Sequence, residues 1–177
     1  MDYGKAMGTV EQWDLYDENR RPIGRTMARG ELMRPGEYHI QVSIWTVNSD
    51  KELLVTRRDP RKGVYAGKWE NTGGGVLAGE TSPQGAVREL REETGIAAAE
   101  EELILLGTDR TESAFVDVYL LKRDVPIGSI VLQEGETVDA KWVTLETLDG
   151  MVRDFTLALP IGIRLQHVRE AFEAHIG

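Results

Sequence analysis

Short apolar blocks separated by polar turns run along the chain and predict several strands and few helices. Residues 11–20 are typical of a strand that ends in a polar turn, and residues 21–34 lead back towards a second strand, which predicts an N-terminal hairpin. Residues 38–47 (YHIQVSIWTV) alternate and are rich in β-branched side chains, which predicts a strand. A turn at 48–50 and the apolar residues 53–56 then predict a second hairpin.

The clearest helix is predicted over residues 82–95. Ser82 is typical of an N-cap, Pro83 suits the first helical position, and Gly95 follows the last periodic residue. The preceding segment, residues 57–75, is rich in Gly, Pro, Lys and Arg and therefore predicts a loop.

The second half of the chain predicts further strands and a C-terminal helix. The expected elements are strands at 103–106, 114–121 and 141–144, one or two helical turns at 145–151, and an amphipathic helix at 161–176. The side chains of the last helix that we expect to face inward are Ile163, Val168, Phe172 and His175. Strands with one helix among them and one at the end predict a sheet covered by helices, an α/β sandwich.

Length and composition indicate one globular domain spanning residues 1–177. No apolar run approaches the roughly 18 residues of a membrane span, and the first fourteen residues lack the apolar core of a signal peptide. The chain has no cysteine, which excludes disulfides, thiolate nucleophiles and Cys-ligated zinc or iron–sulfur sites. We therefore expect a cytoplasmic protein without membrane contact.

The charge balance is acidic, with 30 Asp and Glu against 21 Lys and Arg and a net charge of -9. A nucleic-acid polymer requires basic surface, so it is not expected as a partner. A small phosphorylated ligand is still compatible, because a hard cation can screen carboxylates from phosphate oxygens. The three histidines (His39, His167 and His175) are too few and too scattered for a histidine-based metal site.

The predicted helix carries a group of glutamates that could hold a metal ion. At about 100° per residue, Glu89, Glu92 and Glu93 lie within about 100° of one another, and Arg88 lies one turn before Glu92. Neighbouring carboxylates repel one another, and a divalent cation such as Mg²⁺ or Mn²⁺ removes this conflict. The alternative is a solvated acidic face with ordinary Glu–Arg pairs.

Three consecutive glycines precede this helix. Gly73, Gly74 and Gly75 allow the backbone to approach a ligand closely, with carbonyls towards a metal or N–H groups towards phosphate. The alternative is that these glycines make a tight turn and nothing more.

The spacing of residues 74–96 resembles the Nudix box. The pattern is Gly, five residues, Glu, seven residues, Arg-Glu-Leu, one residue, Glu-Glu, one residue, Gly-Ile, and every fixed position is met. The order of strands and loops around the box extends the resemblance to residues 36–150, preceded by the N-terminal strand segment 1–35. The residues that match the fixed positions are Gly74, Glu80, Arg88, Glu89, Leu90, Glu92, Glu93, Gly95 and Ile96.

The resemblance implies an α/β/α sandwich with a mixed sheet and Mg²⁺-dependent hydrolysis of a pyrophosphate bond, with Mn²⁺ as a replacement ion. The expected substrate is a nucleoside diphosphate linked to another group, or a related phosphorylated metabolite. By the resemblance, Glu92 and Glu93 are metal ligands, Glu89 is a ligand or the general base, and Gly74 offers its carbonyl. Arg88 holds the glutamates in place, so that Glu89, Arg88 and Glu92 are the expected catalytic residues. Glu80 supports the loop or a second metal.

A further metal ligand is expected outside the box. Glu134 and Glu136, just before the strand at Trp142, are the candidates, because an additional acidic residue often completes such a site. The alternative is that both are ordinary glutamates of a surface loop.

The upstream sequence resembles the isopentenyl-diphosphate-isomerase-like branch of the family. The shared features are the N-terminal strand segment, a basic RR…K stretch and Gly-x-Trp before the box. The isomerase itself needs a cysteine after that Trp, whereas residues 70–75 here read ENTGGG. Hydrolysis is therefore favoured, and the alternatives are a non-catalytic regulator that binds nucleotides or phosphorylated metabolites and a prenyl diphosphate isomerase-like enzyme.

Residues 57–68 carry five basic side chains and one acid, which is unusual in so acidic a chain. Arg57, Arg58 and Lys68 are expected to bind substrate phosphates, since guanidinium groups suit phosphate geometry. Trp69 is a candidate surface for stacking a base. The alternatives are a solvated loop and a core tryptophan.

The remaining aromatic and imidazole residues are interpreted as structural. Trp13, Trp45 and Trp142 are expected in the core or an interface, and His39 is expected to be structural. The N-terminal segment could pair with a second chain, so a homodimer is one expectation.

Overall fold

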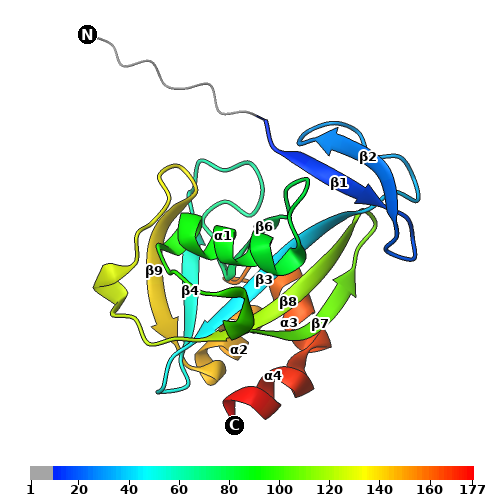
Figure 1. Cartoon of the computed structure of the whole chain (residues 1–177). Coiled ribbons are helices and arrows are strands. Elements are labelled where there is room, and N and C mark those ends of the chain that lie inside the picture. Colours follow the sequence, from blue (N-terminus) through cyan, green and yellow to red (C-terminus); the bar gives the residue numbers. More distant parts are fainter. Residues whose placement is uncertain (1–9) are drawn as a thin grey trace.

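The computed structural model describes residues 10–177, in which a mixed sheet lies between two helical layers (Figure 1). The first nine residues, which belong to the predicted N-terminal segment and to the signal-peptide argument, lie outside this range. Helix α1 covers one face of the sheet, and α2, α3 and α4 cover the other. The predicted α/β/α sandwich with a mixed sheet is therefore confirmed. Within residues 10–177 no helix is both long and apolar enough to cross a membrane.

The predicted N-terminal hairpin is confirmed as a separate two-stranded sheet of β1 (Gln12–Tyr16) and β2 (Pro22–Ala28). Arg20, in the turn that joins these strands, has a left-handed backbone (φ 60) and donates to both carboxylate oxygens of Asp117. Asp117 is 2% exposed and also accepts from Ser82 and Thr108. This buried carboxylate therefore ties the hairpin to the main sheet and to α1.

Strand β3 (His39–Val47) forms the centre of the main sheet, whose order is β5-β4-β3-β8-β7. It runs parallel to β8 (Ala114–Lys122) along its whole length. Alternate residues of β3 enter different cores: Ile44 packs under α1, and Trp45 packs under α3 and α4. The other elements of the sheet are β4 (Leu53–Arg58), β7 (Leu103–Arg110) and β9 (Thr137–Val143), with the short helices η1 (Glu100–Glu102) and η2 (Ile127–Ser129) between strands.

The sheet opens between β3 and β4. These two strands pair only at Val47 and Leu53 among the described residues, and beyond that point each takes a different neighbour. Strand β6 (Thr72–Gly75) pairs with β3, and β5 (Trp69–Glu70) pairs with β4. The prediction of a loop over 57–75 is therefore wrong at 57–58, which end β4, and at 69–70 and 72–75, because neighbouring strands supply backbone partners that the glycine-rich composition does not reveal.

Helix α1 (Ser82–Thr94) begins at the residue that was predicted as its cap, so the true cap lies one residue earlier. Thr81 is the N-cap and forms a capping box with Gln84, so the prediction of Ser82 as N-cap is wrong. The Ser82 hydroxyl instead donates to Asp117, 2.5 Å away. Gly95 ends the helix with φ 74, as predicted, because the left-handed conformation costs glycine little.

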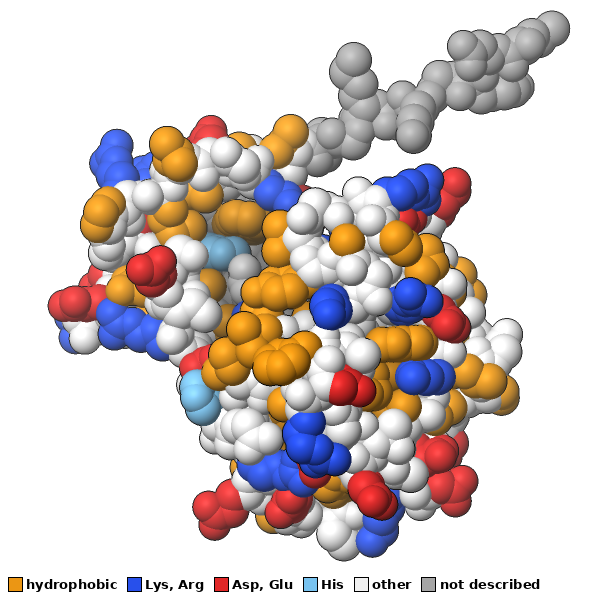
Figure 2. All heavy atoms as spheres, turned by 180° about the vertical axis from the view of Figure 1, so that it is seen from behind, with side chains coloured by type: hydrophobic (Ala, Val, Ile, Leu, Met, Phe, Trp, Pro, Cys, Tyr) orange, Lys and Arg blue, Asp and Glu red, His pale blue; other side chains and the backbone are white. Residues whose placement is uncertain are grey.

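The predicted C-terminal helix is two helices, α3 (Leu159–His167) and α4 (Arg169–Ile176), which follow α2 (Leu145–Arg153). The break at Val168 (φ -106) shifts the helical phase, so one period cannot place both halves. Val168 and Phe172 are buried as predicted, but Ile163 is 45% exposed and His175 is also exposed. On the face that these helices cover, apolar side chains gather beside a hollow (Figure 2).

Candidate active site

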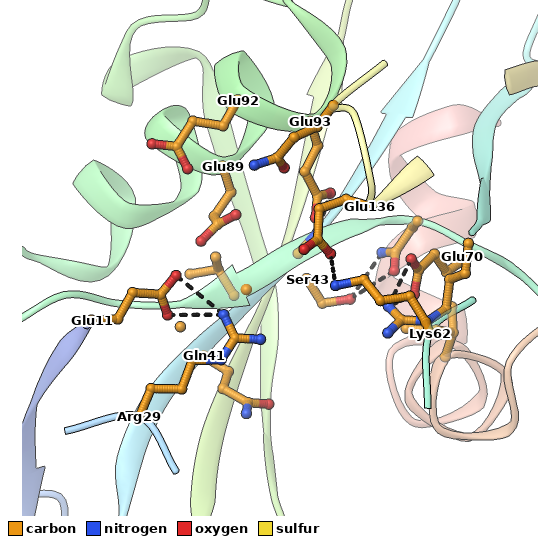
Figure 3. Close-up of a pocket in the computed structure, with 18 of the residues that line it drawn as sticks. Glu11, Arg29, Gln41, Ser43, Lys62, Glu70, Glu89, Glu92, Glu93 and Glu136 are labelled. Carbon is orange, nitrogen blue, oxygen red and sulfur yellow. Dashed lines mark hydrogen bonds and ion pairs between the residues drawn. The ribbon is translucent and has the colours of Figure 1, made fainter. Parts of the chain in front are cut away.

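A cavity of about 300 Å³ lies where α1, β6, the N-terminal hairpin and α3 come together (Figure 3). Its walls are rich in charged and polar side chains. They come from segments far apart in the sequence, so the fold brings together groups that no single motif contains. The charged lining residues are Glu11, Arg29, Arg58, Lys62, Glu70, Glu89, Glu92, Glu93, Glu136 and Arg164.

Arg88 connects the glutamates of α1 to the loop before the helix. Its Nη1 donates to Glu89 at 2.9 Å and to Glu92 at 3.1 Å. Its other nitrogens donate to both oxygens of Glu80 and to the carbonyl of Gly75, at 2.8–3.1 Å. Burial works against the Arg88 charge, but these carboxylates outweigh it and raise its pKa. The guanidinium therefore fixes the loop and the helix in one arrangement.

Glu89 lies against Gly74 at the edge of β6. A Cβ at position 74 would stand 2.3 Å from Glu89 Oε1, so glycine is the residue that this contact allows. Glu89 is 8% exposed, and burial raises the pKa of its carboxyl while the Arg88 charge lowers it. The Nudix-box positions 74 and 89 are thus in direct contact.

Glu93 is a partly buried carboxyl of the cavity that lies near Glu89 and Glu70. Its Oε2 accepts a hydrogen bond from the Gly73 N–H at 3.2 Å, and no basic side chain among residues 10–177 pairs with it. Burial, reinforced by the charges of Glu89 and Glu70, raises the pKa of Glu93 well above its ordinary value. A partly desolvated carboxyl next to other carboxylates is stabilised by a proton or by a bound cation.

The predicted metal ligands lie together, but they do not enclose an ion as they stand. Within residues 10–177 no three acidic or imidazole side chains converge tightly enough to hold a metal in their present rotamers. The contacts give the reason, since Arg88 draws Glu89 and Glu92 towards itself. The available donors nevertheless fit a hard divalent cation, because Glu89, Glu92, Glu93 and the Gly74 carbonyl offer oxygen atoms alone.

The wall opposite α1 carries two ion pairs that involve the basic segment. Arg58 Nη1 donates to both oxygens of Glu70 at 3.0 Å, and Lys62 pairs with Glu136. Of the two glutamates predicted outside the box, Glu136 lines the cavity, whereas Glu134 is exposed and does not. Burial raises the pKa of the Glu70 carboxyl more than Arg58 lowers it.

The residues predicted to bind substrate phosphates separate into two groups. Arg58 lines the cavity, but Arg57, Lys68 and Trp69 do not. Arg57 donates to the Gly67 carbonyl at 3.1 Å, and Lys68 donates to the Phe155 carbonyl at 2.6 Å. Trp69 packs against the core under α3, with Lys141 Nζ 4.2 Å from its ring centroid. These contacts hold the basic segment in shape.

Several cavity residues escaped the sequence interpretation. Trp13 was expected in the core or an interface, yet it lines the cavity and stacks on His39 with ring centroids 4.2 Å apart. Trp45 is buried as expected, and Trp142 packs partly against the core under α1. The members without a sequence signal, because they are remote from the box or isolated in their segments, are Glu11, Arg29, Gln41, Ser43, Asn71 and Arg164. Glu70 directly follows the Gly-x-Trp feature and could have been found from it.

Comparison with known proteins decides the family. A family model described as the NUDIX domain matches residues 37–159. The chain belongs to the Nudix family. An uncharacterized Nudix hydrolase of Listeria monocytogenes is 36% identical to this Nudix protein over 148 residues, covering 80% of this chain and 85% of that protein. The prediction of a Nudix hydrolase, an enzyme class that acts on pyrophosphate bonds, is thereby confirmed at the level of the family.

More distant relatives agree with the branch and with the fold. An isopentenyl-diphosphate Delta-isomerase of Klebsiella pneumoniae is 27% identical over 143 residues, covering 76% of each chain, as expected for an isomerase-like branch. A crystal structure from Deinococcus radiodurans superposes with a TM-score of 0.73 and 24% identity, covering 92% of this chain and 99% of that one. The latter likeness shows the fold.

Proposed function

We propose that this Nudix protein hydrolyses a pyrophosphate bond in a nucleoside diphosphate linked to another group, or in a related phosphorylated metabolite, with Mg²⁺ as its cofactor. The observation that carries the proposal is Glu93, a partly buried carboxyl in the cavity that no basic side chain among residues 10–177 pairs with, and whose pKa is raised by desolvation and by neighbouring carboxylates. It lies near Glu89 and Glu92, so the atoms that could ligate a metal ion here are carboxylate and carbonyl oxygens. Bound Mg²⁺ would neutralise phosphate oxygens and acidify a water molecule, and Mn²⁺ would serve as well.

The residues of the chain supply positioning and proton transfer. Arg88 donates to Glu89, to Glu92 and to the Gly75 carbonyl. It therefore fixes the helix carboxylates relative to the backbone of the Gly73–Gly75 segment, and both line the cavity. A glutamate of this group accepts the proton of the attacking water. Glu89 suits that role, because burial has already raised the pKa of its carboxyl.

The basic segment supports binding of the diphosphate on the other wall. Arg58 and Lys62 both reach the cavity and are held there by Glu70 and Glu136. Guanidinium and ammonium groups next to a diphosphate offset its negative charge and fix its position. Arg57, Lys68 and Trp69 would then act indirectly, by shaping the segment that carries Arg58.

The isomerase alternative receives less support from the residues present. The isomerase needs a cysteine in the stretch after Trp69 to move a proton at carbon, and residues 70–75 (ENTGGG) contain none. The regulator alternative predicts ligand binding without turnover. A Nudix domain from Shewanella oneidensis with a TM-score of 0.59 and 20% identity was solved in complex with ADP ribose, which makes small nucleotide ligands the first ones to try.

The decisive experiment is a hydrolysis screen with Mg²⁺ across diphosphate compounds, read as released phosphate after phosphatase treatment. Glu93→Gln should lower turnover by orders of magnitude, because a neutral amide oxygen binds Mg²⁺ far more weakly than a charged carboxylate does. Glu101→Gln, in the exposed helix η1, is the matched control and should retain activity. Turnover that survives both Glu93→Gln and a chelator would refute the proposal, and tight binding without product over hours would favour the regulator.

Assembly into a homodimer remains part of the proposal. The β1–β2 hairpin forms its own two-stranded sheet rather than extending the main one, so it offers strand edges to a second chain. Sedimentation at low protein concentration should give a dimer mass, and a monomer mass at all concentrations would contradict this part.

A further inference from the structure

The basic side chains that line the cavity differ in one respect. Arg29, Arg58 and Lys62 each form an ion pair with a carboxylate of the same cavity, namely Glu11, Glu70 and Glu136 in that order. Arg164, on α3, forms no ion pair and donates no side-chain hydrogen bond to any residue between 10 and 177. Its charge is therefore available to a ligand.

The surroundings of Arg164 remove its guanidinium partly from water. Burial is the main influence on its guanidinium and lowers its pKa. Asp109 is the one carboxylate that acts on it, without a hydrogen bond, and Asp109 is itself 3.1 Å from His167 Nδ1. A partly desolvated guanidinium gains more from an anionic oxygen ligand than a solvated one does.

Arg164 also lies on a different side of the sheet from the glutamates. Helix α1 packs on one face, and α3 packs on the other, yet both line the same cavity. The cavity therefore passes through the opening between β3 and β4. Ser43 lines it on the way and lies two residues from Trp45, on the β3 face that α3 covers. A group bound at Arg164 is accordingly separate from one bound at Glu89, Glu92 and Glu93.

We propose that Arg164 binds a phosphate group of the substrate other than the two phosphates of the scissile anhydride, so that preferred substrates carry an additional phosphate monoester. The proposal rests on the proposed function, which places the anhydride at the α1 glutamates. Arg164 is then a residue that determines specificity. Its guanidinium fork matches phosphate oxygens in a way that an ammonium group does not.

Matched pairs of diphosphate compounds test the proposal. Coenzyme A and dephospho-coenzyme A differ by one phosphate monoester, and so do NADPH and NADH. The full chain with Mg²⁺ should hydrolyse the phosphorylated member of one pair with a kcat/KM at least about tenfold higher, the effect of one charge-assisted contact. Arg164→Gln should remove this preference by raising KM, with kcat within about twofold. Arg164→Lys should restore part of it.

Arg153→Gln is the control, because Arg153 is an exposed arginine of α2 that does not line the cavity. It should leave the preference intact. If the wild type and Arg164→Gln show the same ratio within each pair while Mg²⁺-dependent hydrolysis continues, the inference fails and the proposed function stands. If neither pair is hydrolysed, calorimetry with 3′-phosphoadenosine 5′-phosphate and AMP decides. Tighter binding of the former that Arg164→Gln abolishes supports the inference, and any other result overturns it.

Discussion

His39 makes the stability of the fold depend on pH. Its side chain lies at the start of β3, stacked on Trp13, and the residue is 4% exposed. Gln41 Nε2 lies 3.2 Å from His39 Nε2, while His39 Nδ1 has no hydrogen-bond partner among the described residues. Burial lowers the pKa of His39 from 6.5 to about 4. The folded chain therefore favours the neutral imidazole.

The sign and size of the effect follow from this difference. Between pH 6.5 and 4 the unfolded chain holds a proton on His39 that the folded chain does not, so the free energy of unfolding falls as the pH falls through this range. The contribution is complete above pH 6.5 and is lost towards pH 4. A difference of about 2.5 pH units corresponds to about 3 kcal/mol, at roughly 1.4 kcal/mol per unit.

Urea unfolding between pH 7.5 and 4 measures the effect, with the wild type compared with His39→Gln so that the titration of carboxylates cancels. The stability gap between the two proteins should change by about 3 kcal/mol over this range. His175→Gln serves as the control for the loss of an imidazole at an exposed position, on α4. Parallel pH curves for the wild type and His39→Gln would show that the burial argument is wrong.

Three further perturbations test the loop before α1, the hairpin anchor and the helix start. Gly74→Ala places a Cβ against the carboxylate of Glu89, whose flexible side chain can move aside, so it should cost less than about 1 kcal/mol in stability but most of the activity by displacing that carboxylate. A kinetic assay that finds normal turnover contradicts this. Asp117→Asn weakens the contact that ties the hairpin to the sheet and should lower the free energy of unfolding in urea by about 2 kcal/mol. This is less than the loss of a fully buried ion pair would cost, because Arg20 is one-third exposed, and an unchanged urea midpoint would contradict the prediction. Thr81→Ala removes the N-cap of α1 and should lower stability by about 1 kcal/mol with kcat preserved. Ser82→Ala leaves the cap in place and removes the hydrogen bond to Asp117 instead.

The elements that depend on local signals were predictable. Pro83 and Gly95 mark the ends of α1, and the alternation of 38–47 marks β3, because capping and two-residue periodicity act within a few positions. The pairing of β6 with β3 was not predictable, since glycines have little strand preference and are recruited by an edge some thirty residues away in the chain. The break at Val168 escaped because it lacks a proline or glycine.

The residues of the candidate site also separate into those that a local sequence pattern predicts and those that only the tertiary fold brings together. The box residues Glu89, Glu92 and Glu93 could be found because one helical turn contains all three. Arg164 and Trp13 could not, because their proximity to the box is created by α3 and the hairpin packing onto opposite parts of the sheet. Arg57 and Lys68 were predicted to bind substrate from their charge alone. In the structure their side chains donate to the backbone carbonyls of Gly67 and Phe155 and do not line the cavity, so their role as ligands stays a prediction.

In the proposed enzyme, the opening between β3 and β4 places bond cleavage on one side of the sheet and recognition of the extra phosphate on the other. The glutamates that would perform hydrolysis rest on the core around Leu90, whereas α3 rests on the core around Leu165 and Phe172. Exchanging helices α3 and α4 between homologues should therefore change substrate preference and leave the glutamates of α1 in place. Such a chimaera offers a direct route to redesigned selectivity.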